Sequence, residues 1–229
     1  MTEYEAYIQS EWELFTGDPM RAAASLEAVR GLEVNRVLDV GCGGGQELLP
    51  FVTSGNAFGV GIDIAPEVGR LGRKLFAGRA PEARVCFVRA AGESLPFPDN
   101  SFDVVICRVA LPYMDNARAL GEMARVLRPG GAFLLKIHHA RYYLRKLRGG
   151  LRARQPLSMI HAARVLLSGT IYHATRRQPR SRIPSPETFQ SVWLLRRELA
   201  RRNLFIDREL PDGDAATPSF VIIKEGTAN

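Results

Sequence analysis

The chain has 229 residues and a formal net charge of +7, with 46% hydrophobic and 24% charged residues, which is typical of a globular domain with an ample core. No apolar run approaches the roughly 20 residues of a membrane-spanning helix, and the acidic N-terminus (Glu3, Glu11) is unlike a signal peptide, so we expect a cytoplasmic protein. Cys42, Cys86 and Cys107 fall within or beside predicted strands, which favours buried thiols over disulfides or metal ligands.

Residues 2–30 are predicted to form two helices. Aromatic and apolar side chains recur in the first helix at near-helical spacing, namely Tyr4, Ile8, Trp12 and Phe15. Asp18-Pro19 has the pattern of a second helix start. The aromatic stripe has two interpretations: it packs against the rest of the domain, or it forms a lid that holds Tyr4 and Trp12 near a substrate.

A glycine-rich turn follows the first predicted strand, which ends with residues 36–39. The turn, Gly41-Cys42-Gly43-Gly44-Gly45, precedes a helix that is predicted to run from Gln46 to about Ser54. Glycines let the backbone approach a ligand closely, and the first N–H groups of the helix point back toward that ligand. The spacing is not the G-x-G-x-x-G of a dinucleotide site, because Gln46 stands where the third glycine belongs.

The second predicted strand, residues 57–64, ends with a carboxylate at Asp63. An acid at this place can accept hydrogen bonds from both hydroxyls of a ribose, and Ile64 would then stack against the base. The alternative is that Asp63 caps the helix that begins near Pro66.

A third predicted strand at 84–89 leads into the loop Ala91-Gly92-Glu93-Ser94-Leu95-Pro96-Phe97-Pro98-Asp99. The Asp39–Gly45 turn resembles motif I of class I S-adenosylmethionine-dependent methyltransferases, and this loop resembles that of their ubiquinone/menaquinone-biosynthesis (methyltransferase type 11) group. The resemblance implies that S-adenosylmethionine is the cofactor and that the Gly92 N–H meets the adenine. It also implies that Ala91 replaces an Asp that usually accepts from the adenine amino group. Losing that hydrogen bond, about 1.5–3 kcal/mol, should weaken adenine binding unless Glu93 supplies the carboxylate.

The fourth predicted strand, residues 102–107, has an all-apolar centre and leads into Arg108. The stretch 125–131 resembles the same family's helix stop before a fifth strand at 132–137. Ligands of open parallel sheets bind beyond the carboxyl ends of the strands, so the glycine turn, Asp63, Gly92, Arg108 and His138 should share one edge. The predicted cofactor-binding residues are Asp39, Gly41, Cys42, Gly43, Gln46, Asp63, Ile64, Ala91, Gly92, Glu93 and Arg108.

A basic segment, residues 138–185, replaces the short loop that such folds usually have after the fifth strand. Residues 138–186 contain eleven Arg and Lys residues and no Asp or Glu, although the rest of the chain is net acidic. The pattern predicts two basic amphipathic helices with a break near Gly149-Gly150, then a loop at Arg176–Arg182. The segment is a lid over the substrate pocket, a surface for an anionic lipid or membrane, or a nucleic-acid contact; few interleaved aromatics disfavour the last.

A helix over 186–202, with Phe189, Val192 and Trp193 facing inward, and two strands at 205–210 and 219–224 complete the predicted elements. We therefore predict a single α/β methyltransferase domain over residues 1–229. It is a Rossmann-like three-layer sandwich with a seven-stranded, mostly parallel sheet, an antiparallel last strand and a helical insertion after the fifth strand.

Methyl transfer from a sulfonium is an in-line displacement in which the protein chiefly aligns the acceptor. His138 and His139, at the tip of the fifth strand, are candidate bases, or they only hydrogen-bond the lid or the backbone. Tyr113, like Tyr4 and Trp12, could contact the substrate, or it only packs. We expect methylation of an oxygen, nitrogen or carbon of a small metabolite. The alternatives are a cofactor-binding regulatory or membrane-associated protein without turnover, which Ala91 favours, and an RNA methyltransferase; the sequence leaves the oligomeric state open.

Overall fold

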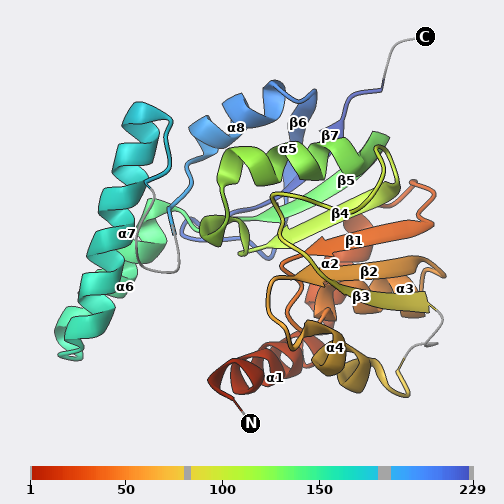
Figure 1. Ribbon diagram of the computed structural model, residues 1–229, viewed down its shortest axis with the longest axis horizontal. Coiled ribbons are helices and arrows are strands. Elements are labelled where there is room, and N and C mark those ends of the chain that lie inside the picture. The colour runs from red at the N-terminus through yellow and green to blue at the C-terminus, as the bar shows by residue number, and fades with distance from the viewer. Residues whose placement is uncertain (1, 80–83, 180–186, 227–229) are drawn as a thin grey trace.

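The computed structural model describes residues 2–79, 84–179 and 187–226, and a seven-stranded sheet lies at its centre (Figure 1). The strands are β1 (Arg36–Val40), β2 (Phe58–Asp63), β3 (Val85–Arg89), β4 (Phe102–Arg108), β5 (Leu127–Lys136), β6 (Leu204–Glu209) and β7 (Ser219–Lys224). Their order is β3-β2-β1-β4-β5-β7-β6. The pairs among β1 to β5 are parallel, and β7 is antiparallel to β5 and to β6, which confirms the predicted sheet.

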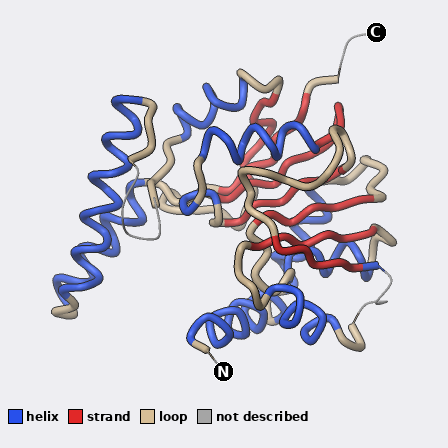
Figure 2. Tube along the Cα trace, viewed as in Figure 1, coloured by secondary structure: helices blue, strands red, loops and turns tan. Residues whose placement is uncertain are grey.

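Helices cover both faces of the sheet and give the three predicted layers (Figure 2). Helices α5 (Asn116–Val126) and α8 (Val192–Ala200) pack on one face. The other face carries α1 (Glu3–Thr16), α2 (Pro19–Ala28), α3 (Leu49–Thr53) and α4 (Val68–Phe76). Adjacent strand residues point to opposite faces, so Val37 and Leu38 enter different cores. Strand β4 is buried along its whole length, as expected for the middle of the sheet.

Two predicted elements differ at their boundaries. The segment after the glycine turn begins as a 3-10 turn, η1 (Gln46–Leu48), before α3 starts. The last helix begins at Val192 instead of about 186, because Ser191 caps it by accepting from the Leu194 N–H at 3.3 Å. Trp193 is 61% exposed, contrary to expectation, because Leu194, Leu195, Glu198 and Leu199 form the inward face of α8.

The thiols also differ from the prediction in one case. Cys42 and Cys107 are buried, as expected, but Cys86 is exposed. Its strand, β3, is the edge strand of the sheet and has a neighbour on one side only. The prediction that all three thiols are buried is therefore wrong for Cys86.

The insertion after β5 forms a helical hairpin that stands away from the sheet (Figure 1). It consists of α6 (Ala140–Arg152) and α7 (Pro156–Thr175), whose shared core includes Tyr143, Ala162 and Val165. The break lies at 153–155, beyond the predicted glycines, because Pro156 starts α7 and restricts the residue before it. The predicted loop at Arg176–Arg182 is described only as far as Pro179. None of the described helices is long and apolar enough to cross a membrane.

Candidate functional site

A cavity of about 330 Å³ opens at the carboxyl ends of β1, β2, β3 and β4. This is the edge at which ligands of open α/β sheets bind. Its volume lies at the small end of ligand pockets. The wall consists of residues from α1, α2 and four strand ends, namely Tyr4, Tyr7, Ile8, Glu11, Arg21, Gly41, Cys42, Gly43, Gln46, Asp63, Ile64, Ala90, Ala91, Gly92, Glu93, Arg108, Val109, Ala110, Tyr113 and Met114.

The glycine turn has a backbone that only glycine adopts readily. Gly41 and Gly43 have φ values of 74° and 53°. Space is limiting as well, because a Cβ added at Gly41 would lie 2.3 Å from the Cβ of Ala110. The N–H groups of Gly41 and Cys42 both donate to the Ile62 carbonyl at 2.9 Å, which ties the turn to the end of β2. The turn is thus held open toward the cavity.

Asp63 lies at the tip of β2 and faces this turn. Its Oδ2 accepts from the Gly43 N–H at 3.0 Å, and its Oδ1 accepts from the Ala65 N–H at 2.9 Å. The second bond closes a local turn after β2, but Asp63 does not cap the following helix α4, whose N-cap is Glu67, so the capping alternative is wrong. Carboxylate oxygens have further lone pairs, so both bonds are compatible with a ligand in the cavity. Burial, and then the charge of Asp63, raise the pKa of the Tyr4 hydroxyl, which also lines the cavity.

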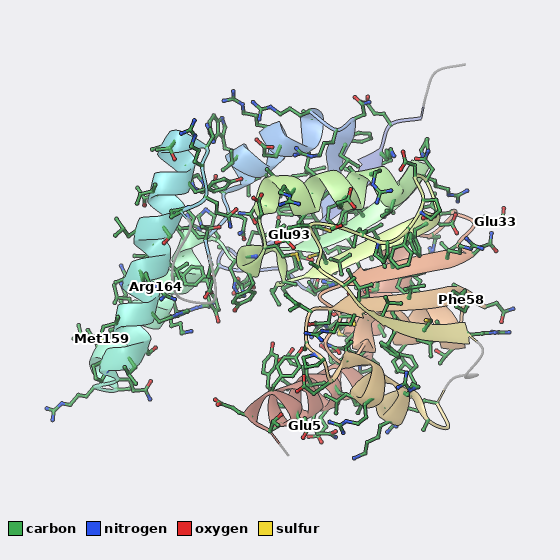
Figure 3. All side chains as sticks on the ribbon, viewed as in Figure 1. Glu5, Glu33, Phe58, Glu93, Met159 and Arg164 are labelled. Atoms are coloured by element: carbon green, nitrogen blue, oxygen red, sulfur yellow. The ribbon has the colours of Figure 1, made fainter. Side chains whose placement is uncertain are left out.

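The loop after β3 forms another part of the wall. Gly92 is buried, and a Cβ there would meet the Met114 sulfur at 2.7 Å. Glu93 lies between the sheet edge and α5 (Figure 3), where its Oε1 accepts from the Asp115 N–H at 2.8 Å. Ala91 presents no polar side-chain atom to the cavity. One Glu93 oxygen therefore already accepts a hydrogen bond at the start of α5. Only the other oxygen could replace the carboxylate that is lost where Ala91 stands.

A buried ionic cluster supports the opposite wall. Glu47 is 2% exposed and contacts two arginines: the Arg21 Nη2 at 2.6 Å and the Arg108 Nε at 3.3 Å. Arg108 also pairs with Asp212. Arg21 and Glu47 were not predicted as site residues from the sequence. For Glu47, the only indication in the sequence was that an acidic residue directly follows Gln46. Both arginines reach the cavity, which makes this wall suited to a carboxylate.

Val109 has a strained backbone at the point where β4 enters the cavity wall. Its φ is 54°, which is unusual for a β-branched residue and costs on the order of 1–3 kcal/mol. Its N–H donates to the Lys136 carbonyl at 2.9 Å, which holds it in place. Such strain is typical of functional sites.

Four predicted site residues lie outside the cavity. Asp39 is buried beneath the turn, and burial and then Glu47 raise its pKa well above the ordinary value. Trp12 packs edge-on against Phe76 in the core, because the helical stripe turns it inward (2% exposed). His139 caps α6 by accepting from the Arg141 N–H at 3.3 Å.

His138 is the fourth of them. Its ring stacks on Tyr142 with 4.0 Å between centroids, and its Nδ1 lies 3.2 Å from the Tyr143 hydroxyl. Burial, and then Lys146 and Lys136, lower its pKa to about 4, which makes it a weak base. Neither predicted histidine is among the residues that line the cavity, and a role as base stays a prediction for both. The other predicted residues, including Tyr4 and Tyr113, line the cavity.

Comparisons with known proteins agree with this geometry. A methyltransferase-domain family matches residues 38–135. The "Uncharacterized methyltransferase YcgJ" of Bacillus subtilis is 39% identical over 107 residues, 46% of this chain and 42% of that protein. The ubiquinone/menaquinone biosynthesis C-methyltransferase UbiE of Geobacter sulfurreducens is 36% identical over 110 residues, which are 47% and 43% of the two chains. The matched region thus spans less than half of these relatives.

Solved structures share the fold over nearly the whole chain. An O-methyltransferase family protein from Burkholderia thailandensis superimposes with a TM-score of 0.67 at 16% identity, covering 98% of this chain and 60% of that one. The structure of the Haloferax volcanii Trm112 methyltransferase activator with the putative methyltransferase gives a TM-score of 0.63 at 19% identity, with 98% and 99% covered. The chain thus shares its fold with solved methyltransferase structures, and residues 38–135 match the methyltransferase-domain family.

Proposed function

We propose that this protein transfers a methyl group from S-adenosylmethionine to a small molecule. The observation that carries the proposal is the convergence of the glycine turn, Asp63 and Gly92 on one cavity at the carboxyl edge of the sheet. These are the places where the family resemblance puts the amino-acid part, the ribose and the adenine of the cofactor.

The residues of the cavity fit this cofactor. Asp63 would accept from the ribose hydroxyls, and Ile64, 71% exposed at the rim, offers an apolar surface for the adenine. The Gln46 Oε1 is buried without a hydrogen-bond partner and could accept from the cofactor's ammonium group. The Arg21 Nε is likewise buried and unpartnered, and could donate to its carboxylate.

The bound cofactor supplies an electrophilic methyl group on a sulfonium, so the protein has to orient the acceptor and exclude water. Helix α1 covers the turn, since a Cβ at Gly43 would lie 2.6 Å from the Ile8 Cδ1. Tyr4, Tyr7 and Tyr113 form a tyrosine wall on the cavity. Aromatic rings with polar tips are suited to a largely apolar acceptor that carries a polar group.

Relatives indicate the same class of substrate. One is named 27-O-demethylrifamycin SV methyltransferase (Amycolatopsis mediterranei), and another is UbiE. Their names cover oxygen and carbon acceptors, so the acceptor atom does not follow from the match. The non-catalytic alternative rests on Ala91, and the RNA alternative on the basic hairpin.

Calorimetry with S-adenosylmethionine, S-adenosylhomocysteine and NADH tests the proposal. We expect binding of the first two and none of NADH, followed by S-adenosylhomocysteine formation with members of a phenol and quinol panel. NADH binding without S-adenosylmethionine binding would contradict the cofactor. Cofactor binding without turnover on any acceptor would favour the regulatory alternative.

A second role, also a proposal, concerns the tip of the α6–α7 hairpin. Leu151, Leu157 and Ile160 are 65%, 81% and 64% exposed, and Arg148 and Arg152 flank them. The hairpin carries no acidic residue. An anionic lipid surface satisfies both features, because it attracts the arginines and takes up the apolar side chains. Met159 and Arg164 lie on the part of α7 that stands away from the sheet (Figure 3).

Vesicle flotation tests this surface. We expect the protein to float with phosphatidylglycerol vesicles but not with phosphatidylcholine vesicles, and to detach at high salt because screening weakens the attraction. Leu157→Asp should abolish flotation, whereas the same substitution at Leu14, which is 62% exposed on α1, should not. Equal binding to both lipids, or salt-dependent RNA binding instead of vesicle binding, would overturn the lipid assignment.

A further inference from the structure

A buried carboxylate lies behind the tyrosine wall, and the family resemblance assigns it no role. Glu187 is 5% exposed. Its Oε1 accepts from the Tyr143 hydroxyl at 2.7 Å, and its Oε2 lies 3.1 Å from the His161 Nε2. Within residues 2–79, 84–179 and 187–226, no Arg or Lys forms an ion pair with it. These two partners are thus a hydroxyl and an imidazole, both of which are groups that can exchange a proton.

Tyr113 connects this carboxylate to the cavity. It belongs to the short turn η3 (Leu111–Tyr113) after β4, it is 51% exposed, and it lines the cavity. Burial, and then the charge of Glu187, raise the pKa of Tyr113, so the carboxylate acts on this hydroxyl. Since an ionised carboxylate only accepts, the Tyr113 hydroxyl would be the donor in a hydrogen bond between the two. Its oxygen lone pairs remain for a group inside the cavity.

The chain around Glu187 fixes its position. The Thr188 N–H donates to the Pro112 carbonyl at 3.0 Å, which ties the segment to η3 beside Tyr113. The Gln190 N–H donates to the His138 carbonyl at 2.9 Å. Because the Tyr143 hydroxyl donates to Glu187, it accepts from the Nδ1 of His138 in turn. His138 is thus a positioning residue for the network instead of the base itself.

His161 connects the same carboxylate to solvent. Its side chain is 32% exposed, whereas that of Glu187 is 4% exposed. The three side chains therefore lead from the cavity wall, through a buried carboxylate, to the surface of α7. The step from Glu187 to His161 already has hydrogen-bond length, and the step from Tyr113 needs its hydroxyl to turn onto the carboxylate.

We propose that Tyr113, Glu187 and His161 form a proton path for an acceptor with an acidic hydroxyl, such as a phenol; this rests on the methyl transfer proposed above. The acceptor O–H proton moves to the Tyr113 oxygen while the Tyr113 proton moves to Glu187. The acceptor oxygen uses the freed electron pair for its bond to the methyl carbon, and the pair of the broken carbon–sulfur bond stays with the leaving sulfur. Glu187 then passes the proton through His161 to water, and every group returns to its starting state.

The first test needs no turnover. With tyrosine labelled at the ring carbon that bears the hydroxyl, NMR follows ionisation of Tyr113, assigned by its loss in Tyr113→Phe. We expect Glu187→Gln to lower the pKa of Tyr113, because the substitution removes the negative charge. An unchanged Tyr113 titration would show that the two groups do not interact and would overturn the proposal. Unchanged calorimetric binding of S-adenosylhomocysteine would show that the Glu187→Gln variant is folded and keeps its cofactor site.

The second test separates proton removal from structural support. At about pH 8, 4-nitrophenol is largely ionised and needs no base, whereas 4-methoxyphenol does. Glu187→Gln should reduce kcat/KM at least 10²-fold for 4-methoxyphenol and leave 4-nitrophenol nearly unchanged, about the effect of a lost general base. Tyr172→Phe, a buried tyrosine on α7, is the matched control and should affect neither phenol.

Equal losses with both phenols would mean that Glu187 only supports the fold, which would overturn the proton path. If the wild type binds S-adenosylmethionine and methylates an amine but no phenol, the hydroxyl class is wrong while the methyltransferase assignment stands. If S-adenosylmethionine does not bind, the proposed function itself fails.

Discussion

Replacing Asp63 with Ala is the sharpest test of the cofactor site. The carboxylate accepts from the Gly43 N–H at 3.0 Å and from the Ala65 N–H at 2.9 Å, and it would accept from two ribose hydroxyls. Hydrogen bonds to a charged group contribute about 1.5–3 kcal/mol each, so the loss of two of them costs about 3–6 kcal/mol. We therefore expect Asp63→Ala to weaken S-adenosylhomocysteine binding about 10²- to 10⁴-fold.

Calorimetry with S-adenosylhomocysteine measures this loss without turnover. Glu27→Ala is the matched control, because it also removes a carboxylate but lies on the surface, 58% exposed beside Arg30. Asp63→Asn should fall between the wild type and Asp63→Ala, since an amide oxygen can replace only part of the acceptor capacity. Thermal unfolding should show that all three variants are folded. Binding of S-adenosylhomocysteine to Asp63→Ala within threefold of wild type would refute the ribose role of this residue.

Three further predictions concern the turn, the adenine loop and the pH dependence of stability. Ala91→Asp should tighten S-adenosylhomocysteine binding by about tenfold, since it restores a charge-assisted hydrogen bond to the adenine amino group; weaker binding in calorimetry would show that Glu93 already fills that place. Gly41→Ala should lose binding and lower the melting temperature, because its φ is 74° and the new Cβ would lie 2.3 Å from that of Ala110; a wild-type melting temperature would contradict the clash. Hydrogen bonds from the backbone N–H groups of Thr217 and then Ala216 lower the pKa of Asp214 to about 2. The contribution of Asp214 to the stability of the fold is therefore present above pH about 4 and is lost as the pH falls toward 2. Asp214→Asn should therefore reduce stability at neutral pH and make acid unfolding less steep between pH about 2 and 4; unfolding curves that run parallel to wild type at every pH would exclude this role.

The cofactor side of the cavity was predictable because it is encoded locally. Gly41, Asp63 and Gly92 each follow a strand within a few residues, and parallel strands bring their carboxyl ends to one edge. Strand alternation and the all-apolar centre of β4 sufficed to predict the layers. The prediction needed only periodicity and the places where each strand ends.

The parts that escaped prediction depend on contacts between distant residues. Arg21 and Glu47 are 26 residues apart, and Tyr143 and Glu187 are 44 apart. In each pair the contact offsets the cost of taking a polar group out of water, and no local sequence pattern shows which distant group will supply that contact. His138 shows the opposite error: its place at a strand tip was predicted correctly, but its ring turned toward Tyr142 and Tyr143.

The division between the two sides of the cavity also limits what the relatives reveal. The family match ends at residue 135, so it includes Gly41, Asp63 and Gly92 but neither α1 nor the hairpin. Tyr4 and Tyr7 come from α1, and Glu187 follows the hairpin, so the groups that would meet an acceptor lie largely outside the match. The match to the relatives therefore indicates the cofactor, but it does not indicate the methyl acceptor. The acceptor has to be inferred from the tyrosine wall and the buried carboxylate behind it. A comparison of ionised and neutral phenols is therefore more informative than a screen of the relatives' substrates.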